Sequence, residues 1–282
     1  MIVHTIEETR RRVAKARAEG KRIGFVPTMG ALHEGHAALI RRSVAECDFT
    51  AVSIFVNKLQ FGAGEDFDKY PRTLDSDAAI CKDVGADLVF APSHDEMYPH
   101  EPRAFVEVEG LTEGLCGRFR PGHFRGVTTV VAKLFHIVGP DVAYFGEKDA
   151  QQLYVIRRMV RDLDFPLEIR GVPTVREADG LAMSSRNRYL APAERAAAPA
   201  LYRGLSRARE LMEQGERDAE RVREAVRAEI AREPLMREQY VEVVDVDQLK
   251  PLAVIEDKAL VAAAVYLGET RLIDNVMFDS SS

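Results

Sequence analysis

Residues 27–36 read Pro27-Thr28-Met29-Gly30-Ala31-Leu32-His33-Glu34-Gly35-His36, and this stretch decides the fold. It follows Ile23–Val26, a short apolar segment typical of a buried strand, and it leads into a helical pattern that ends near Cys47. The glycines let the backbone approach a ligand closely, and a helix N-terminus offers N–H groups to an anion. The two histidines lie near one helix face and can donate hydrogen bonds to phosphate. The stretch therefore predicts a strand–turn–helix unit that binds a nucleotide phosphate.

Two other interpretations of the histidine pair stay open. Paired histidines often bind zinc, although no third His, Cys or carboxylate completes a ligand motif in this stretch. Either histidine could instead be a buried structural residue. The strand–turn–helix context favours phosphate binding over both.

Short apolar strands alternate with amphipathic helices along the first 174 residues or so. Further strands are expected at 50–56, 87–90, 142–145 and 167–172, and helices at 5–20, 75–84, 126–138 and 149–163. This alternation is typical of an α/β fold whose Rossmann-like parallel sheet is covered on both faces. Ligands bind such sheets outside the carboxyl ends of the strands, so we expect the chemistry in the loops after Val26, Val56 and Phe145.

The pattern changes after about Thr174. Two charged helices are expected at 192–214 and 217–232, followed by three strands at 240–246, 259–267 and 271–276. The sequence therefore predicts two domains: a Rossmann-like domain over residues 1–174 and a smaller C-terminal α+β domain over residues 175–282.

Composition excludes several classes of protein. The 282 residues are 46% hydrophobic and 30% charged, as in an ordinary soluble protein. A net charge of −6 argues against broad nucleic-acid binding, and the apolar runs are too short for a membrane span. Charged residues interrupt the N-terminal segment, so no signal peptide is expected, and three separated cysteines indicate no disulfide framework. A cytoplasmic location is the simplest expectation.

Two later motifs have residue types that suit phosphate. Gly146-Glu147-Lys148-Asp149 follows a predicted strand, where Lys148 can place a positive charge against a phosphate. Ser184-Ser185-Arg186 supplies two hydroxyls and a guanidinium, which suit pyrophosphate. The alternatives are a solvated turn for the first motif and a plain helix cap for the second.

The motifs taken together resemble those of the pantothenate synthetase family. His33-Glu34-Gly35-His36 by itself resembles only the wider nucleotidyltransferase superfamily. The longer stretch 27–36 is similar to pantothenate synthetases specifically, and six further motifs of that family follow in order: Val56-Asn57-Lys58-Leu59-Gln60-Phe61, Tyr70-Pro71-Arg72-Thr73-Leu74, Arg120-Pro121-Gly122-His123-Phe124, Gly146-Glu147-Lys148-Asp149, Gln151-Gln152 and Ser184-Ser185-Arg186-Asn187. The resemblance runs from about residue 2 to residue 278.

The resemblance implies an ATP-dependent ligase that activates pantoate as an acyl-adenylate and joins it to β-alanine, with Mg²⁺ assisting. It assigns ATP binding to Met29, Gly30, Ala31, Leu32, His33, Glu34, Gly35, His36, Gly146, Glu147, Lys148, Asp149, Val175, Met183, Ser184, Ser185 and Arg186. The catalytic group would comprise His36, His33, Lys148 and Arg186, with His36 as a proton donor or a plain hydrogen-bond donor.

By the same resemblance, Gln60, Gln152, Asn57 and Arg120 bind pantoate, and Gln60 also lies close to β-alanine. A surface role for the two glutamines, or an ordinary ion pair for Arg120, stays open from the residues alone. The family further implies a homodimer whose C-terminal domain closes over the ATP site.

The chain departs from the family at Lys58, where a proline is usual. Proline fixes φ, so Lys58 should loosen the entry to residues 62–73, which resemble the family's lid over the pantoate pocket. An irregular surface loop is the alternative for that segment. Two other functions stay open: an adenylyltransferase for a different small acid, and a nucleotide-binding regulator without catalysis.

Overall fold

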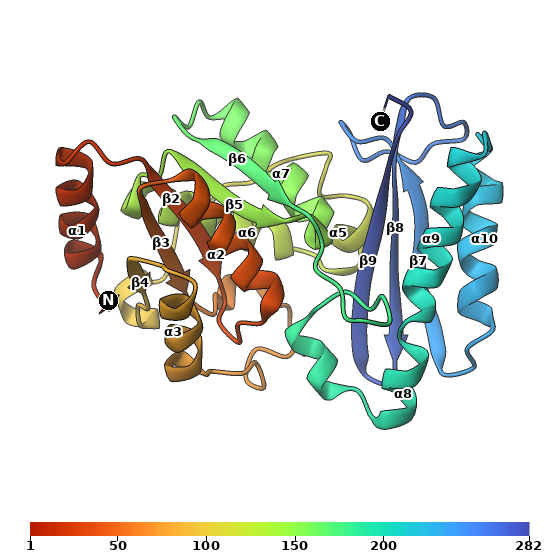
Figure 1. The fold of residues 1–282 in the computed structure, drawn as a ribbon, viewed down its shortest axis with the longest axis horizontal. Coiled ribbons are helices and arrows are strands. Elements are labelled where there is room, and N and C mark those ends of the chain that lie inside the picture. Colours follow the sequence, from red (N-terminus) through yellow and green to blue (C-terminus); the bar gives the residue numbers. More distant parts are fainter. Residues whose placement is uncertain (282) are drawn as a thin grey trace. The chain divides into compact units, whose positions relative to one another are not determined.

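The computed structural model describes residues 1–281 and divides the chain into two compact units (Figure 1). The first unit comprises Met1–Val108, Arg120–Glu147 and Val155–Pro173. The second unit comprises Glu109–Phe119, Lys148–Tyr154 and Thr174–Ser282. Each unit has its own sheet and its own apolar core.

The first unit is built on a parallel sheet of six strands in the order β1-β4-β3-β2-β5-β6. The strands are β1 (Ile2–Val3), β2 (Ile23–Thr28), β3 (Phe49–Ile54), β4 (Leu88–Phe90), β5 (Val142–Gly146) and β6 (Glu168–Val172). The strand order reverses between β2 and β5, because β3 and β4 extend the sheet on one side and β6 on the other. The predicted α/β fold is confirmed, and the loops after β2 and β5 leave the sheet where such folds bind ligands.

Helices cover both faces of this sheet, because successive strand residues face opposite sides. Val26 and Tyr144 belong to a core with residues of α2 (Glu34–Glu46) and α3 (Leu74–Asp83). Their neighbours Phe25 and Phe145 each pack edge-on against Phe135 of α6 (His123–Val138), at a centroid distance of 6.4 Å. The first unit also contains α1 (Ile6–Ala18), which contacts α6, the short helix α4 (His94–Met97) and the 3-10 helix η1 (Lys58–Gln60).

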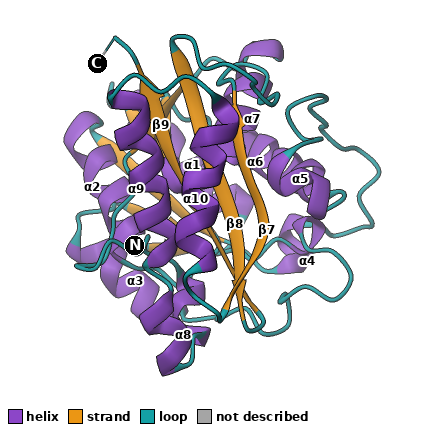
Figure 2. Cartoon of the chain, turned by 90° about the vertical axis from the view of Figure 1, so that its right-hand side faces the viewer, coloured by secondary structure: helices purple, strands orange, loops and turns teal. Residues whose placement is uncertain are grey.

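The second unit has an antiparallel sheet in the order β7-β8-β9. Its strands are β7 (Met236–Val244), β8 (Lys258–Leu267) and β9 (Thr270–Asp279), and its longer helices are α9 (Ala200–Glu213) and α10 (Ala219–Ala231). The two helices lie against one face of the sheet, as Figure 2 shows. They bury an apolar core with the Ala- and Val-rich strand β8. Shorter elements complete the unit: α5 (Leu115–Phe119), the 3-10 helix η3 (Ser185–Tyr189) and α8 (Pro192–Ala197).

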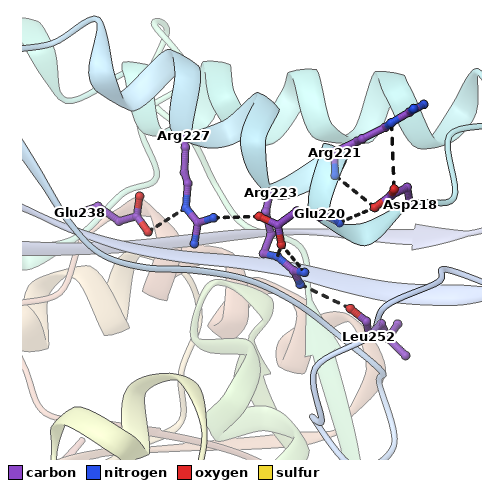
Figure 3. A network of polar contacts seen from close by, with 7 residues as sticks. All are labelled: Asp218, Glu220, Arg221, Arg223, Arg227, Glu238 and Leu252. Atoms are coloured by element: carbon purple, nitrogen blue, oxygen red, sulfur yellow. Dashed lines mark hydrogen bonds and ion pairs between the residues drawn. The ribbon is translucent and has the colours of Figure 1, made fainter.

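A polar network fastens α10 to the rest of the second unit (Figure 3). Arg227 donates to Glu238 of β7 at 3.1 Å and to Glu220 at 3.2 Å. Arg223 donates to the carbonyl oxygen of Leu252 at 3.4 Å, in the segment before β8. Exposed ion pairs contribute at most about 1 kcal/mol each, so the apolar core carries most of the stability of this layer.

One predicted helix is wrong. The stretch 192–214 forms two helices, α8 and α9, which are interrupted at Ala198 and Pro199. Pro199 has no N–H to donate, and its ring would clash with the carbonyl group four residues earlier in a continuous helix. Other elements match with shifted ends: β7 begins at Met236 rather than 240, and α6 begins at His123 rather than 126. The helix α7 (Ala150–Asp162), whose residues are divided between the two units, follows the 3-10 helix η2 (Glu147–Asp149).

Candidate functional site

The loop after β2 has a backbone that few residues adopt easily. Gly30 has φ +82° and Ala31 has φ +50°. A Cβ atom at Gly30 would lie 3.0 Å from a carboxylate oxygen of Asp77 and 3.2 Å from the Ile54 side chain. The glycine is therefore needed both for its positive φ and for the close approach of Asp77.

Asp77 holds this loop in place. Its carboxylate accepts hydrogen bonds from the backbone N–H of Ala31 at 3.0 Å and of Leu32 at 2.8 Å. The hydroxyl of Thr73 donates to the same carboxylate at 3.2 Å, and Asp77 is 1% exposed. Nothing in the sequence distinguishes Asp77 as a site residue, because an acidic residue in the first turn of a helix is also expected simply from the helix dipole.

His33 and His36 cap the first turn of α2 reciprocally. Nδ1 of His33 accepts the N–H of Gly35 at 3.1 Å, and Nδ1 of His36 accepts the N–H of His33 at 3.3 Å. A ring nitrogen that accepts a backbone N–H carries no proton, so each neutral imidazole bears its proton on Nε2. The capping geometry thus makes Nε2 of both histidines a hydrogen-bond donor.

The predicted pantoate residue Gln60 lies beside the predicted nucleotide loop. Its Nε2 is 3.1 Å from Sδ of Met29, and its Oε1 accepts from Nδ2 of Asn57 at 3.2 Å. Asn57 also donates to the carbonyl oxygen of Gly126 at 3.0 Å and accepts from the hydroxyl of Tyr98 at 3.1 Å. Asn57 is 1% exposed and Gln60 8%, so neither amide is an ordinary solvent-exposed side chain.

Close packing between η1 and α6 places these amides. A Cβ atom at Gly126 would lie 2.3 Å from the carbonyl oxygen of Leu59 and 2.6 Å from Cα of Gln60. Only glycine lets the two backbones approach this closely. Gly126 was expected in a helix, and no pattern in the sequence indicates this contact.

Arg120 joins residues 62–73 to η1. Its guanidinium forms two hydrogen bonds with Glu65, at 2.7 and 2.5 Å, and donates to the carbonyl oxygen of Gln60 at 3.4 Å. His123 supports it: Nδ1 is 2.8 Å from the same carbonyl oxygen, and Nε2 is 3.0 Å from Arg120. Those partners require Nδ1–H and an accepting Nε2, so His123 is neutral.

The Glu65–Arg120 pair changes the acidity of Glu65. Partial burial acts to raise the pKa of the Glu65 carboxyl, but the hydrogen bond and charge of Arg120 outweigh it and lower the pKa. Two aromatic residues of the 62–73 segment, Phe67 and Tyr70, pack edge-on against Phe61, the residue before the segment, at centroid distances of 5.4 and 6.1 Å. The segment is thus bonded through Glu65 to Arg120, which in turn contacts Gln60 of η1 and His123 of α6.

Lys148 is the middle residue of the short helix η2, which begins directly after β5. Its ammonium group lies 3.9 Å from the carboxylate of Asp149, and its side chain is 19% exposed. Within the second unit, the side-chain amide of Asn275 donates to the carbonyl oxygen of Lys148 at 2.9 Å. β9 therefore fixes the backbone at this predicted site residue.

Residues 175–183 form a short hairpin with an antiparallel bridge between Arg176 and Ala182, and η3 follows it in the second unit. The N–H of Met183 donates to the carbonyl oxygen of Val175 at 3.0 Å, so these two predicted ATP-binding residues are neighbours. Ser184 caps η3, since its hydroxyl accepts the N–H of Arg186 at 3.3 Å. A capping role for Ser184 is thus observed, and the cap holds Ser185 and Arg186 in the same turn.

The predicted motif Gln151-Gln152 divides into two environments. Gln151 is 6% exposed, and its amide bonds the N–H of Cys116 and the carbonyl oxygens of Leu111 and Gly114, at 2.8 to 2.9 Å. Gln151 therefore orders residues 111–116. Gln152, the predicted pantoate residue, is half-buried on α7.

The zinc interpretation of the histidine pair finds no support in residues 1–281. No group of three or more His, Cys, Asp or Glu side chains is arranged there to hold a metal ion. No helix in the same residues is long and apolar enough to cross a membrane.

Comparison with known proteins gives a consistent result. A family model described as pantoate-beta-alanine ligase matches residues 1–277. A pantothenate synthetase from Heliobacterium modesticaldum is 60% identical over 261 residues, covering 93% of each chain. A crystal structure of pantothenate synthetase from Thermus thermophilus has a TM-score of 0.93 at 49% identity, covering 98% of each chain. A Francisella tularensis pantoate-beta-alanine ligase, complexed with beta-gamma ATP and beta-alanine, has a TM-score of 0.79 at 32% identity, covering 100% of this chain and 98% of that one.

Proposed function

The chain belongs to the pantoate–β-alanine ligase family, and on this premise we propose how its residues carry out the reaction. The enzyme joins pantoate to β-alanine in an ATP-dependent ligation that yields pantothenate. Its match to the family extends over nearly the whole chain, so both units belong to the ligase.

The proposed reaction has two steps. A carboxylate oxygen of pantoate attacks the α-phosphorus of ATP, the bond to the β-phosphate breaks, and pyrophosphate leaves. The neutral amine of β-alanine then attacks the acyl carbon, AMP leaves with the electron pair of the broken C–O bond, and the amine loses a proton. The enzyme contributes mainly alignment of the reacting groups and stabilisation of the developing negative charge.

The proposal assigns ATP binding to several segments of the chain. In the first unit the loop and helix start at 29–36 bind the nucleotide, with Gly146 and Glu147. His33 and His36 donate from Nε2 to phosphate oxygens, which the capping geometry of α2 supports. In the second unit the proposal assigns Lys148, Asp149, Val175 and residues 183–186 to ATP. The amides of Ala31 and Leu32 already bond Asp77, so these two residues contact ATP through other atoms.

Gln60 and Gln152 are the proposed hydrogen-bonding partners of pantoate, and Gln60 also lies near β-alanine. The burial of Gln60 and its contact with Met29 support its place beside the nucleotide loop. Asn57 and Arg120 act on the pocket through Gln60, the first through its side-chain oxygen and the second through its backbone carbonyl.

Mg²⁺ enters as MgATP in this proposal. Mg²⁺ keeps several waters and binds phosphate oxygens readily, so it does not need a cage of protein carboxylates. We also propose a homodimer, on the family likeness, and a cytoplasmic location, which suits three free cysteines.

ATP–pyrophosphate exchange tests the adenylation step. With D-pantoate present, the enzyme should exchange labelled pyrophosphate into ATP, and adding β-alanine should release AMP. No exchange in the presence of D-pantoate, in protein that binds ATP, would instead indicate a different acid substrate or a nucleotide-binding protein without this catalysis.

A further inference from the structure

The buried amides of Asn57 and Gln60 have a fixed direction. The carbonyl oxygen of Gly126 can only accept, so the group of Asn57 that faces it at 3.0 Å must be the donor Nδ2. The second proton of Nδ2 goes to Oε1 of Gln60 at 3.2 Å. Because Oε1 of Gln60 faces Asn57, its Nε2 is turned away from Asn57 and lies beside Sδ of Met29.

Tyr98 completes this chain of hydrogen bonds. Once Nδ2 of Asn57 is committed to two acceptors, Oδ1 needs a donor, and the hydroxyl of Tyr98 supplies it at 3.1 Å. Tyr98 is 8% exposed. Burial raises the pKa of Tyr98 to about 12, so its hydroxyl keeps its proton at neutral pH.

The ring of Tyr98 is held from several sides. Phe55 lies 6.1 Å away between ring centroids, and Nζ of Lys133 lies 5.1 Å from the ring centroid. Lys133 also donates to the carbonyl oxygen of Met97, and the N–H of Tyr98 donates to the carbonyl oxygen of His94 at 2.7 Å, which ends α4. The hydroxyl is therefore directed at Asn57 by contacts that do not involve the pocket.

We propose that Tyr98 is a positioning residue that, through Asn57, keeps the Gln60 amide with its N–H donors toward pantoate. The inference rests on the proposed assignment of Gln60 to pantoate. A donor at this point suits the carboxylate and hydroxyl oxygens of pantoate, which accept hydrogen bonds. The opposite orientation would place the Gln60 carbonyl oxygen against those oxygens and repel the carboxylate. Tyr98 thus helps to select an acid with acceptor oxygens.

The variant Tyr98→Phe removes only the hydroxyl. Tyr98→Phe leaves a buried acceptor without its donor. The D-pantoate concentration that half-saturates the exchange reaction, here called the D-pantoate value, should therefore rise about tenfold. The ATP concentration that half-saturates the same reaction should stay unchanged. Tyr144→Phe is the matched control, because its buried hydroxyl donates to Glu46 at 3.0 Å in the same unit and has no contact with Gln60. An unchanged value for D-pantoate in Tyr98→Phe would overturn the inference.

A double-mutant cycle separates positioning from a general loss of structure. If Tyr98 acts through Gln60, adding Tyr98→Phe to Gln60→Ala should raise the D-pantoate value no further. Independent, multiplying effects of the two substitutions would overturn the inference. If Tyr98→Phe does not fold, Gln60→Glu takes its place in the test. Gln60→Glu puts an oxygen where the Nε2 donor was, so it should raise the D-pantoate value more than Gln60→Ala does. An equal or smaller rise would count against an outward donor.

The same measurements show which proposal has failed: the ligase function, the assignment of Gln60 to pantoate, or the role of Tyr98. A wild-type enzyme without pantoate-dependent exchange would refute the proposed function and the inference with it. A wild-type enzyme with such exchange, combined with an unchanged D-pantoate value in Gln60→Ala, would leave the ligase in place and refute the assignment of Gln60. A raised value in Gln60→Ala but not in Tyr98→Phe would refute the role of Tyr98 alone.

Discussion

At the scale of single residues, the two histidines of α2 have a structural and a proposed catalytic role at different ring nitrogens. Nδ1 of each ring caps the helix, and Nε2 is the donor. These roles separate experimentally, because asparagine can replace the accepting atom of histidine without supplying a donor at the position of Nε2.

His36→Asn should therefore keep the fold and lose the chemistry. The rate of adenylation should fall on the order of 100-fold or more, the usual effect of removing one donor to a transition state. Pre-steady-state kinetics measure the rate of adenylation, and the thermal unfolding temperature shows whether the helix cap is kept. His36→Ala, which loses both functions, is the comparison. A rate within a few-fold of wild type in His36→Asn would rule out a catalytic role for Nε2.

At the scale of elements, the contact between η1 and α6 decides where Asn57 and Gln60 lie. Gly126 faces the backbone of Leu59 and Gln60 closely enough that any side chain must displace η1. The same helix carries His123, which bonds the Gln60 carbonyl oxygen. α6 is thus the surface on which this half of the proposed pocket is built.

Gly126→Ala should destabilise the protein by about 1–3 kcal/mol, the usual cost of an inserted methyl group, and weaken pantoate binding. Denaturant unfolding and pantoate half-saturation measure the two effects. Gly114→Ala is the control, because its Cβ atom would meet its nearest neighbour at an ordinary 3.7 Å. Equal effects of the two variants would contradict the importance of this contact.

The Glu65–Arg120 pair makes the 62–73 segment sensitive to pH. Because the folded-state pKa of Glu65 is lowered, its stabilising contribution is present above the unfolded value of 4.5 and is lost as pH falls through the lower folded value. Glu65→Gln should remove this dependence and speed amide hydrogen exchange in 62–73 at neutral pH. Glu101→Gln, at an exposed glutamate of the same unit, is the control. Unchanged exchange in Glu65→Gln would show that the pair with Arg120 does not order the segment.

At the scale of the whole molecule, each compact unit stabilises its own part of the proposed machinery through contacts between distant segments. In the second unit, Arg176 forms two hydrogen bonds with Asp274, at 2.6 and 3.0 Å, and stacks on Tyr202 at 3.6 Å. The Asp274 side chain is 2% exposed. The hairpin before η3 is thereby fastened to β9 and α9.

Asp274→Asn should lower the free energy of unfolding by about 3–5 kcal/mol, because it leaves the Arg176 charge without its partner. Denaturant unfolding measures this loss. Asp279→Asn, at a solvent-screened ion pair with Lys258, should lower the free energy of unfolding much less in the same assay. Equal losses in the free energy of unfolding in the two variants would show that burial does not make the Arg176–Asp274 pair more stabilising than an exposed pair.

The helices and strands, and the chemical groups that they carry, follow from local patterns in the sequence. Apolar strand runs and amphipathic helices are local patterns, so the parallel sheet, the turn at 27–36 and the three C-terminal strands were predicted correctly. The prediction of one continuous helix at 192–214 was wrong. The Ala/Arg/Glu periodicity continues through this stretch, but Pro199 ends the first helix. The motifs supplied the candidate residues, because residue type alone limits which groups can donate, accept or carry charge.

The tertiary structure alone decided which groups meet. Asp77 reaches the loop at Ala31 across 46 residues of sequence, Asn57 reaches Gly126 across 69, and Arg176 reaches Asp274 across 98. Such pairs have no local period, since packing of whole elements brings them together. The direction of the Gln60 amide depends on Gly126 and Tyr98 in the same way. The sequence therefore specifies which donors and acceptors are present, and the folded chain decides which of them pair and in which direction.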